Sequence, residues 1–120
     1  MTEKTIVQDE RELRGWLVVL SGEWRGKDFP LFAGRNSAGS SHDAGIYLPD
    51  EGIEFFHFSI RCEDDAVYLT DLDSHCGVYI DQVRIYRGKI ADETIFETAG
   101  IAFLIKHLQL AVDPPKREAA

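Results

Sequence analysis

The segment that decides the fold covers residues 57–80 and has the sequence HFSIRCEDDAVYLTDLDSHCGVYI. It contains three runs rich in β-branched and aromatic residues, at 57–61, 66–70 and 78–80. The acidic triplet Glu63-Asp64-Asp65 separates the first two runs, and aspartate is one of the residues that favour turns. We therefore predict a β-hairpin from Arg61 to Thr70, with a third strand after the next loop.

Similar runs recur along the chain at intervals of roughly ten residues, separated by Gly, Asp, Asn and Ser, a spacing typical of an all-β sandwich or barrel. The further predicted strands are 16–20, 28–32, 46–48, 82–86, 94–96 and 101–112. In the last of these, apolar residues alternate from Phe103 to Val112, as expected for a strand with one face on a core. Helical periodicity is weaker. The pattern predicts two packed antiparallel sheets with almost no helix.

The composition predicts one soluble domain. The chain has 120 residues, of which 44% are hydrophobic and 28% charged, which is typical of a globular protein with a single core. We expect flexible tails at 1–14 and 113–120 around a domain at 15–112, and Pro114-Pro115 indicates the start of a linker as an alternative to a tail. No apolar run approaches the ~20 residues that span a bilayer.

The net charge limits the classes of partner, and the cysteines indicate the cellular compartment. The net charge is −8, with 21 acidic and 13 basic residues, so nucleic acid and anionic membranes are poor partners. Cys62 and Cys76 form no C-x-x-C pair, and the N-terminal segment does not resemble a secretory signal. We expect a cytoplasmic protein, or the cytoplasmic domain of a membrane protein.

The order of four motifs resembles the forkhead-associated (FHA) domain. The motifs are Gly39-Ser40, Ile46-Tyr47-Leu48-Pro49-Asp50, Glu54-Phe55-Phe56-His57-Phe58-Ser59-Ile60, and the stretch from Tyr68 to Ile80. They are similar to the family's Gly-Arg, Ile-x-Leu-x-Asp, Ser-x-x-His and Asp-Leu-x-Ser-x-Asn-Gly-Thr. The resemblance covers about Gly15 to Val112 and implies an FHA-like β-sandwich that recognises proteins and is not an enzyme.

The resemblance also implies where a phosphothreonine would bind. In the family an arginine, a serine and an asparagine at the loop tips hold the phosphate, because a dianion needs guanidinium, hydroxyl and amide donors. In this sequence these positions are Ser40, Glu54 and Cys76, and the threonine after the glycine becomes Val78. With Ser41, these residues form a candidate site whose polar donors are mostly replaced.

Further residues are predicted to support the binding loops or to offer an alternative phosphate anchor. The resemblance implies that Gly39, His57 and Gly77 support the loops. Arg35 offers an alternative anchor that could act with Ser40 and Ser41. It lies nineteen residues before Glu54, whereas the family spacing requires fourteen residues, which is the separation of Ser40 from Glu54.

Exposed aromatic residues are the other candidate contacts. Alternation predicts that Phe55 or Phe56, or both, face solvent, and core packing is the alternative reading for this pair. Trp24 lies in a predicted hairpin loop and is a second candidate. The N-terminal Thr2 and Thr5 resemble phosphorylation sites found in some bacterial FHA regulators.

The sequence contains no motif for metal binding, nucleotide binding or catalysis. Adjacent His75 and Cys76 point apart on an extended chain, so we expect no metal site, and the glycines precede no Gly-Lys-Ser/Thr, so we expect no nucleotide or other cofactor. Ser74, Cys76 and His57 are residue types that could form a hydrolase site. No G-x-S-x-G frame supports such a site, and a small enzyme is therefore a remote alternative.

We expect a protein-interaction module that acts without phosphothreonine inside a signalling or secretion assembly. Its partner would be another protein or a second copy of the chain, and not a small-molecule substrate. The domain could be fused to, or recruited by, a membrane assembly. The alternative is a phosphothreonine receptor with a non-standard pocket.

Overall fold

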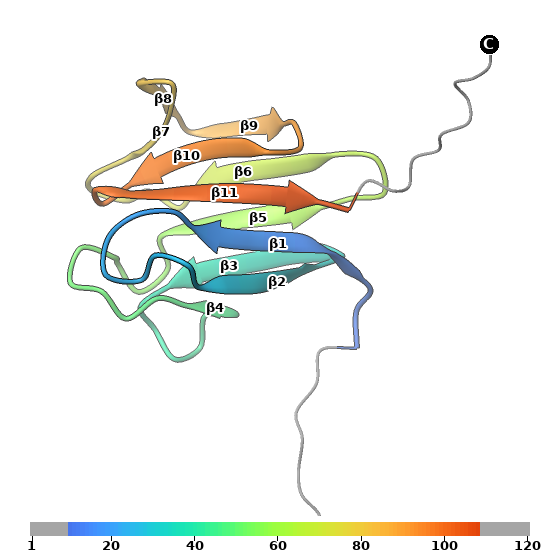
Figure 1. Cartoon of the computed structure of the whole chain (residues 1–120), viewed down its shortest axis with the longest axis horizontal. Helices are drawn as coiled ribbons and strands as arrows, with labels where there is room; N and C mark the ends of the chain where they lie inside the picture. The colour runs from blue at the N-terminus through green and yellow to red at the C-terminus, as the bar shows by residue number, and fades with distance from the viewer. Residues whose placement is uncertain (1–9, 109–120) are drawn as a thin grey trace, which may run out of the picture.

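The computed structural model describes residues 10–108, which form eleven strands and no helix (Figure 1). The strands are β1 (Leu13–Val19), β2 (Asp28–Phe32), β3 (Gly34–Gly39), β4 (Ile46–Tyr47), β5 (Phe58–Cys62), β6 (Val67–Asp71), β7 (Val78–Ile80), β8 (Val83–Ile85), β9 (Arg87–Ile90), β10 (Thr94–Thr98) and β11 (Ile101–His107). Among the described residues, no helix is long and apolar enough to cross a membrane.

The strands form two sheets that pack face to face. One sheet has six strands in the order β2-β1-β11-β10-β7-β8, and the other has five in the order β4-β3-β5-β6-β9. Neighbouring strands are antiparallel except β3 and β4, which run parallel through Ala38–Ile46 and Gly39–Tyr47. This arrangement confirms the predicted β-sandwich, with one parallel pair that the sequence pattern did not indicate.

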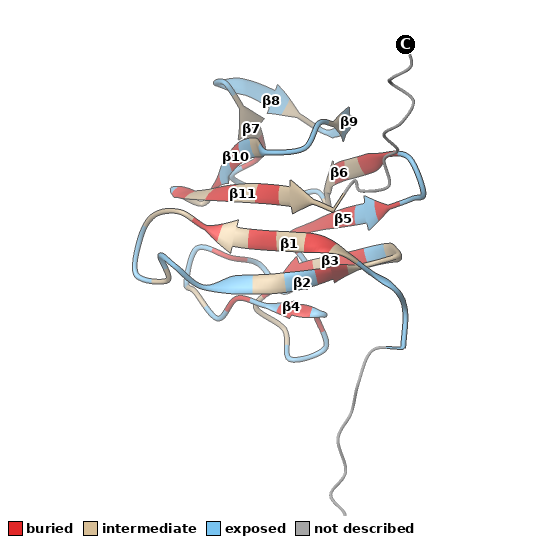
Figure 2. Ribbon diagram, turned by 45° about the vertical axis from the view of Figure 1, so that its right-hand side comes forward, coloured by how far each residue is buried: buried red, intermediate tan, exposed pale blue. Residues whose placement is uncertain are grey.

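The core lies between the sheets and is centred on three phenylalanines. Phe58 comes from the five-stranded sheet, and Phe96 and Phe103 come from the six-stranded sheet. All three are fully buried, with ring centroids 5.1 to 5.6 Å apart. Burying each ring contributes up to about 3 kcal/mol. Buried and more exposed residues alternate along β1 and β11, so these strands turn one face to the core (Figure 2).

The predicted hairpin is present as β5 and β6. Cys62 lies opposite Val67, and the backbone N–H of Glu63 donates to the carbonyl of Ala66 at 2.8 Å across the acidic turn. The first strand begins at Leu13, and the C-terminal boundary predicted at 112 lies outside the described residues.

Two strands, β3 and β9, were absent from the prediction. β3 has the sequence GRNSAG, which contains no β-branched or aromatic residue. Its buried Asn36 compensates, because the side-chain amide accepts from the N–H of Phe32 and donates to the carbonyls of Phe32 and Ile60, all at 2.9 to 3.0 Å. Tertiary hydrogen bonds thus stabilise a strand that its own residues do not favour.

Three loops gather at one end of the sandwich, on the left in Figure 1. They are the β3–β4 loop (40–45), the β4–β5 loop (48–57) and the β6–β7 loop (72–77), beside the β10–β11 turn at 99–100. We call these three loops the loop end. It contains four of the five positions at which the sequence predicted a binding site, namely Ser40, Ser41, Glu54 and Cys76.

Candidate functional site

The first two loops of the loop end are joined through their backbones. The N–H of Ser40 donates to the carbonyl of Glu54 at 2.9 Å, and the N–H of Ser41 donates to the carbonyl of Phe55 at 3.2 Å. A Cβ added at Gly39 would overlap the carbonyl oxygen of Phe55, so the two chain segments approach too closely for any other residue. Gly39 therefore sets the position of Glu54 and Phe55.

A buried histidine links this pair of loops to the third loop and to both sheets. His57 is fully buried, and its Nδ1 accepts from the N–H of Glu54 at 3.0 Å, so Nε2 carries the proton and donates to Thr98 Oγ1 at 2.8 Å. The Thr98 hydroxyl in turn donates to the carbonyl of Gly77 at 2.7 Å. Thr98 lies on β10 and His57 directly precedes β5, so this chain of hydrogen bonds spans the sandwich.

The environment of His57 favours its neutral form. Burial lowers the pKa of His57, and the nearby carboxylates of Glu54 and Asp71 oppose this effect only in part. A neutral ring is also the only form that can accept at Nδ1. His57 is therefore a structural brace, in keeping with the role that the family resemblance implied.

Glu54 adds a side-chain bridge between the second and third loops. Its Oε2 accepts from the backbone N–H of His75 at 2.7 Å, a short, charge-assisted hydrogen bond. The resemblance to the FHA pattern implies a serine at this position, whose hydroxyl could donate a hydrogen bond to a bound phosphate. In this chain the position holds an anion that accepts hydrogen bonds and cannot donate one.

The third loop is held by its own polar residues. The N–H of Ser74 donates to Asp71 Oδ1 at 2.9 Å, and the Ser74 hydroxyl accepts from the N–H of Gly77 at 3.0 Å. Gly77 has a φ of 83°, a conformation that favours glycine. The exposed Cys76 places its Sγ 3.5 Å from His57 Nε2 and from Thr98 Oγ1.

The loop end brings together four of the five predicted site residues. Ser40, Ser41, Glu54 and Cys76 all lie on its loops. The fifth, Val78, is fully buried in the core at the start of β7, so its side chain cannot contact a ligand. The assignment of Val78 to the binding site was therefore wrong, because the family pattern counts positions along the chain and does not show which way a side chain points.

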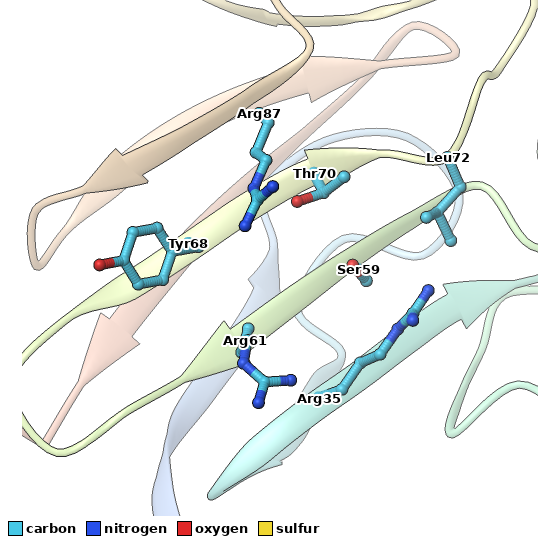
Figure 3. Close-up of a pocket in the computed structure, with 7 residues that line it drawn as sticks. All are labelled: Arg35, Ser59, Arg61, Tyr68, Thr70, Leu72 and Arg87. Atoms are coloured by element: carbon cyan, nitrogen blue, oxygen red, sulfur yellow. The ribbon is translucent and has the colours of Figure 1, made fainter.

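Arg35 belongs to β3 and not to the loops, although it lines a surface hollow together with Asp43, Gly45 and Phe56. It is on β3 opposite Arg61 of β5, and its side chain extends over the outer face of the five-stranded sheet (Figure 3). Five residues of extended chain, about 16 Å, separate it from Ser40. The structure thus places Arg35 on the sheet and not with Ser40 and Ser41.

The exposed aromatic residues differ from the prediction in one case. Phe55 and Phe56 are 73% and 45% exposed, so both members of this pair face solvent. Trp24 is half-buried and packs against the core, so it is less exposed than predicted, and its role as a contact residue stays a prediction. Sequence reasoning missed His42 and Tyr47, whose rings stack at 4.7 Å beside the β3–β4 loop, because no motif links them.

Two further predictions concern other sites. Thr2 and Thr5 lie outside the described residues. Within 10–108, no group of three or more His, Cys, Asp or Glu side chains is arranged to hold a metal ion.

Residues 18–109 match the family described as "Inner membrane component of T3SS, cytoplasmic domain". The chain belongs to this family. The family description, which names a cytoplasmic domain of the type III secretion system (T3SS), agrees with the cytoplasmic placement and the secretion assembly expected from the sequence.

Individual relatives extend the comparison. The FHA domain-containing protein FhaA of Mycobacterium tuberculosis is 26% identical over 81 residues, which cover 68% of the chain and 15% of FhaA. The chain thus corresponds to a small part of that relative. The solved FHA domain of the CT664 protein from Chlamydia trachomatis is 28% identical, with a TM-score of 0.71 over 78% of this chain and 96% of that one.

A solved T3SS protein has the same fold. The cytoplasmic domain of the sorting platform protein PscD from P. aeruginosa is 21% identical, with a TM-score of 0.69 over 86% of each chain. Together these likenesses confirm the FHA fold. The chain is an FHA-like protein-interaction domain, and FHA domains are interaction modules and not enzymes.

Proposed function

We propose that the loop end binds a protein partner without phosphothreonine, as part of a T3SS on the cytoplasmic side of the inner membrane. The observation that carries this proposal is the hydrogen bond from the His75 N–H to the Glu54 carboxylate at 2.7 Å. It fixes an anion between two loops at the position where the family has a phosphate-binding serine. FhaA, a relative, has been solved with the intracellular domain of Rv3910, which is a protein partner.

Electrostatics support the loss of phosphate binding. At ~6 Å and an effective dielectric of ~20, the Glu54 carboxylate would repel each unit of phosphate charge by about 2 to 3 kcal/mol before salt screening. Ser40 stands where the family has the arginine, and losing a guanidinium partner of a buried charge costs about 2 to 5 kcal/mol. A micromolar phosphopeptide interaction would thus become millimolar or weaker.

Exposed aromatic residues supply the contact in place of the phosphate. Phe55 and Phe56 present two rings to solvent directly after Glu54. The backbone hydrogen bond from Ser41 to Phe55 holds this segment against the β3–β4 loop. Large aromatic side chains on a fixed backbone are typical binding hot spots, because they bury much apolar area at a low entropic cost.

Calorimetry with a degenerate phosphothreonine library and its unphosphorylated counterpart tests the proposal. We expect no phosphate-dependent affinity tighter than about 100 μM, which corresponds to about −5.5 kcal/mol. Tighter phosphate-dependent binding would refute it, and loss of that binding in Arg35→Ala would favour the alternative pocket.

The reverse experiment restores the family's donors. The triple variant Ser40→Arg, Glu54→Ser and Cys76→Asn should begin to bind phosphothreonine peptides, because it replaces the repelling carboxylate and supplies guanidinium and amide donors. Val78 is left unchanged because it is part of the core. The matched control is Cys76→Asn alone, which leaves Glu54 in place and should not bind.

A further inference from the structure

The outer face of the five-stranded sheet carries a groove of about 300 Å³ that is lined by neither Phe55 nor Phe56 and reaches the loop end at Leu72. We call it the basic groove. It is lined by Arg35, Ser59, Arg61, Tyr68, Thr70, Leu72 and Arg87. Figure 3 shows that Arg35 lies along β3, Arg61 turns from β5 toward β3, and Arg87 reaches from β9 over β6, all on the same face of the sheet.

The strand register explains how these cations come together. Arg35 of β3 is directly opposite Arg61 of β5, and Thr70 of β6 is opposite Arg87 of β9. Lys89, two residues after Arg87 on the same strand, is opposite Tyr68 and adds an exposed cation beside the groove. Three strands far apart in sequence thus contribute charge to one face.

The fold gains nothing from this arrangement. Like charges directly opposite on neighbouring strands destabilise a sheet, as Arg35 and Arg61 do here. No acidic residue lines the groove, and Arg61 is the one lining arginine with a salt bridge among the described residues, at 2.6 Å to Glu63. A chain with a net charge of −8 therefore concentrates positive charge on one sheet face, where only the charge of Arg61 among the lining arginines is paired in the described part of the chain.

We propose that the basic groove binds an extended, carboxylate-rich segment of a protein partner, independently of the loop end. Charge complementarity identifies the occupant, since a guanidinium group pairs with a carboxylate through two parallel hydrogen bonds. From β3 to β9 the sheet spans three strand spacings, about 14 Å, which four or five extended residues match. The Ser59 and Thr70 hydroxyls and the Tyr68 ring line the floor between the charges.

Nucleic acid is a poorer occupant. Its dense phosphate charge would meet the acidic remainder of the chain on either side of a groove only a few residues long. A short acidic peptide avoids this repulsion because it ends where the cations end.

Fluorescence anisotropy with a labelled twelve-residue peptide of alternating Glu and Ser, added to the full chain at low salt, tests the proposal. Arg87→Glu should weaken binding at least tenfold. Arg25→Glu, which makes the same charge change in the exposed β1–β2 turn, should weaken it less than threefold. Arg35→Ala, which removes only one charge, tests the contribution of a second lining arginine to peptide binding. Unchanged melting temperatures would show that the variants are folded.

A gain-of-binding variant makes the test sharper. Glu63→Gln releases Arg61 from its salt bridge and should tighten peptide binding two- to fivefold. Glu23→Gln, in the β1–β2 turn, removes the same charge and should leave the affinity nearly unchanged. A purely structural role for Arg61 would predict no difference between these two variants.

Several results would overturn the proposal. Equal effects of Arg87→Glu and Arg25→Glu would reduce the binding to net charge. A tenfold preference for a phosphoserine peptide or for a single-stranded oligonucleotide, lost in Arg87→Glu, would assign the groove to phosphate. Self-association that Arg87→Glu abolishes, seen by sedimentation without peptide binding, would assign it to a second copy. Phe55→Ser should leave peptide binding unchanged, so this test and that of the loop end fail separately.

Discussion

Replacing Gly39 with alanine tests the close approach that forms the loop end. A Cβ at this position would lie 2.5 Å from the carbonyl carbon of Phe55 and closer still to its oxygen. Both are backbone atoms, so the clash cannot be relieved by a side-chain rotation. The β4–β5 loop must instead move away from β3.

The free energy of unfolding should fall by about 2 to 4 kcal/mol. Inserting an atom into a packed site costs about 1 to 3 kcal/mol. Displacing the loop also loosens the hydrogen bonds from Ser40 and Ser41 to Glu54 and Phe55, each worth about 1 kcal/mol. The lower entropy of the unfolded chain returns about 0.4 to 1 kcal/mol.

Urea unfolding of the variant and of a matched control measures this loss. Gly45→Ala lies in the β3–β4 loop, which follows Gly39, and an added Cβ there would lie 3.7 Å from the Ser37 carbonyl oxygen, an ordinary contact. We expect the control to remain within about 1 kcal/mol of the natural chain. If Gly39→Ala unfolds at the same urea concentration as Gly45→Ala, the argument that Gly39 positions Phe55 is refuted.

Three further predictions concern pH, the thiols and the aromatic surface. Because burial lowers the pKa of His57, the unfolded chain takes up a proton below pH ~6.5 before the folded chain does, so stability should fall as the pH drops below that value. Thermal melts from pH 7.5 to 5 measure this loss of stability. The loss should persist in His107→Gln, which removes the other described histidine with a lowered pKa. A melting temperature that does not change with pH in that variant would contradict the assignment to His57. A thiol reagent at pH 8 should modify the exposed Cys76 quickly. The buried Cys62, whose pKa is raised to about 11, should react only on unfolding, so fast modification of both thiols would disprove its burial. Phe55→Ser should weaken partner binding and shift the melting temperature by less than about 3 °C, whereas a large shift would place the ring in the core.

The sequence predicted the strands whose own residues favour extended chain. β5 and β6 alternate apolar and polar residues around a strong turn signal, β11 is a long apolar run in which buried and less buried residues alternate, and the structure confirms all three. β3 was missed because Asn36 and the neighbouring strands stabilise it from outside its own sequence. β9, with the sequence RGKI, is an edge strand with a single pairing partner, where few contacts constrain the residue types.

The candidate site was predictable in position and less so in orientation. The motif order located the loop end, because loops between consecutive strands of a known topology gather at one end. It could not show that Val78 points into the core, that Trp24 packs against it, or that the Glu54 carboxylate bridges to His75. Nor could it show that Arg35 and Arg87 line the same groove, since cross-strand register depends on turns and packing along the whole sheet.

The hydrogen bonds from Glu54 to His57, Thr98 and Gly77 have a consequence for how such domains diverge. They run beneath the loops, and Glu54 takes part only through its backbone N–H, so its side chain can be exchanged while the support stays intact. Cys76 differs, because its Sγ lies 3.5 Å from His57 Nε2 and from Thr98 Oγ1. Descendants of a phosphopeptide receptor could therefore lose its specificity in single steps without passing through an unfolded intermediate. The same separation makes the loops suitable for laboratory retargeting, with His57 and Thr98 kept constant while the surface positions are randomised.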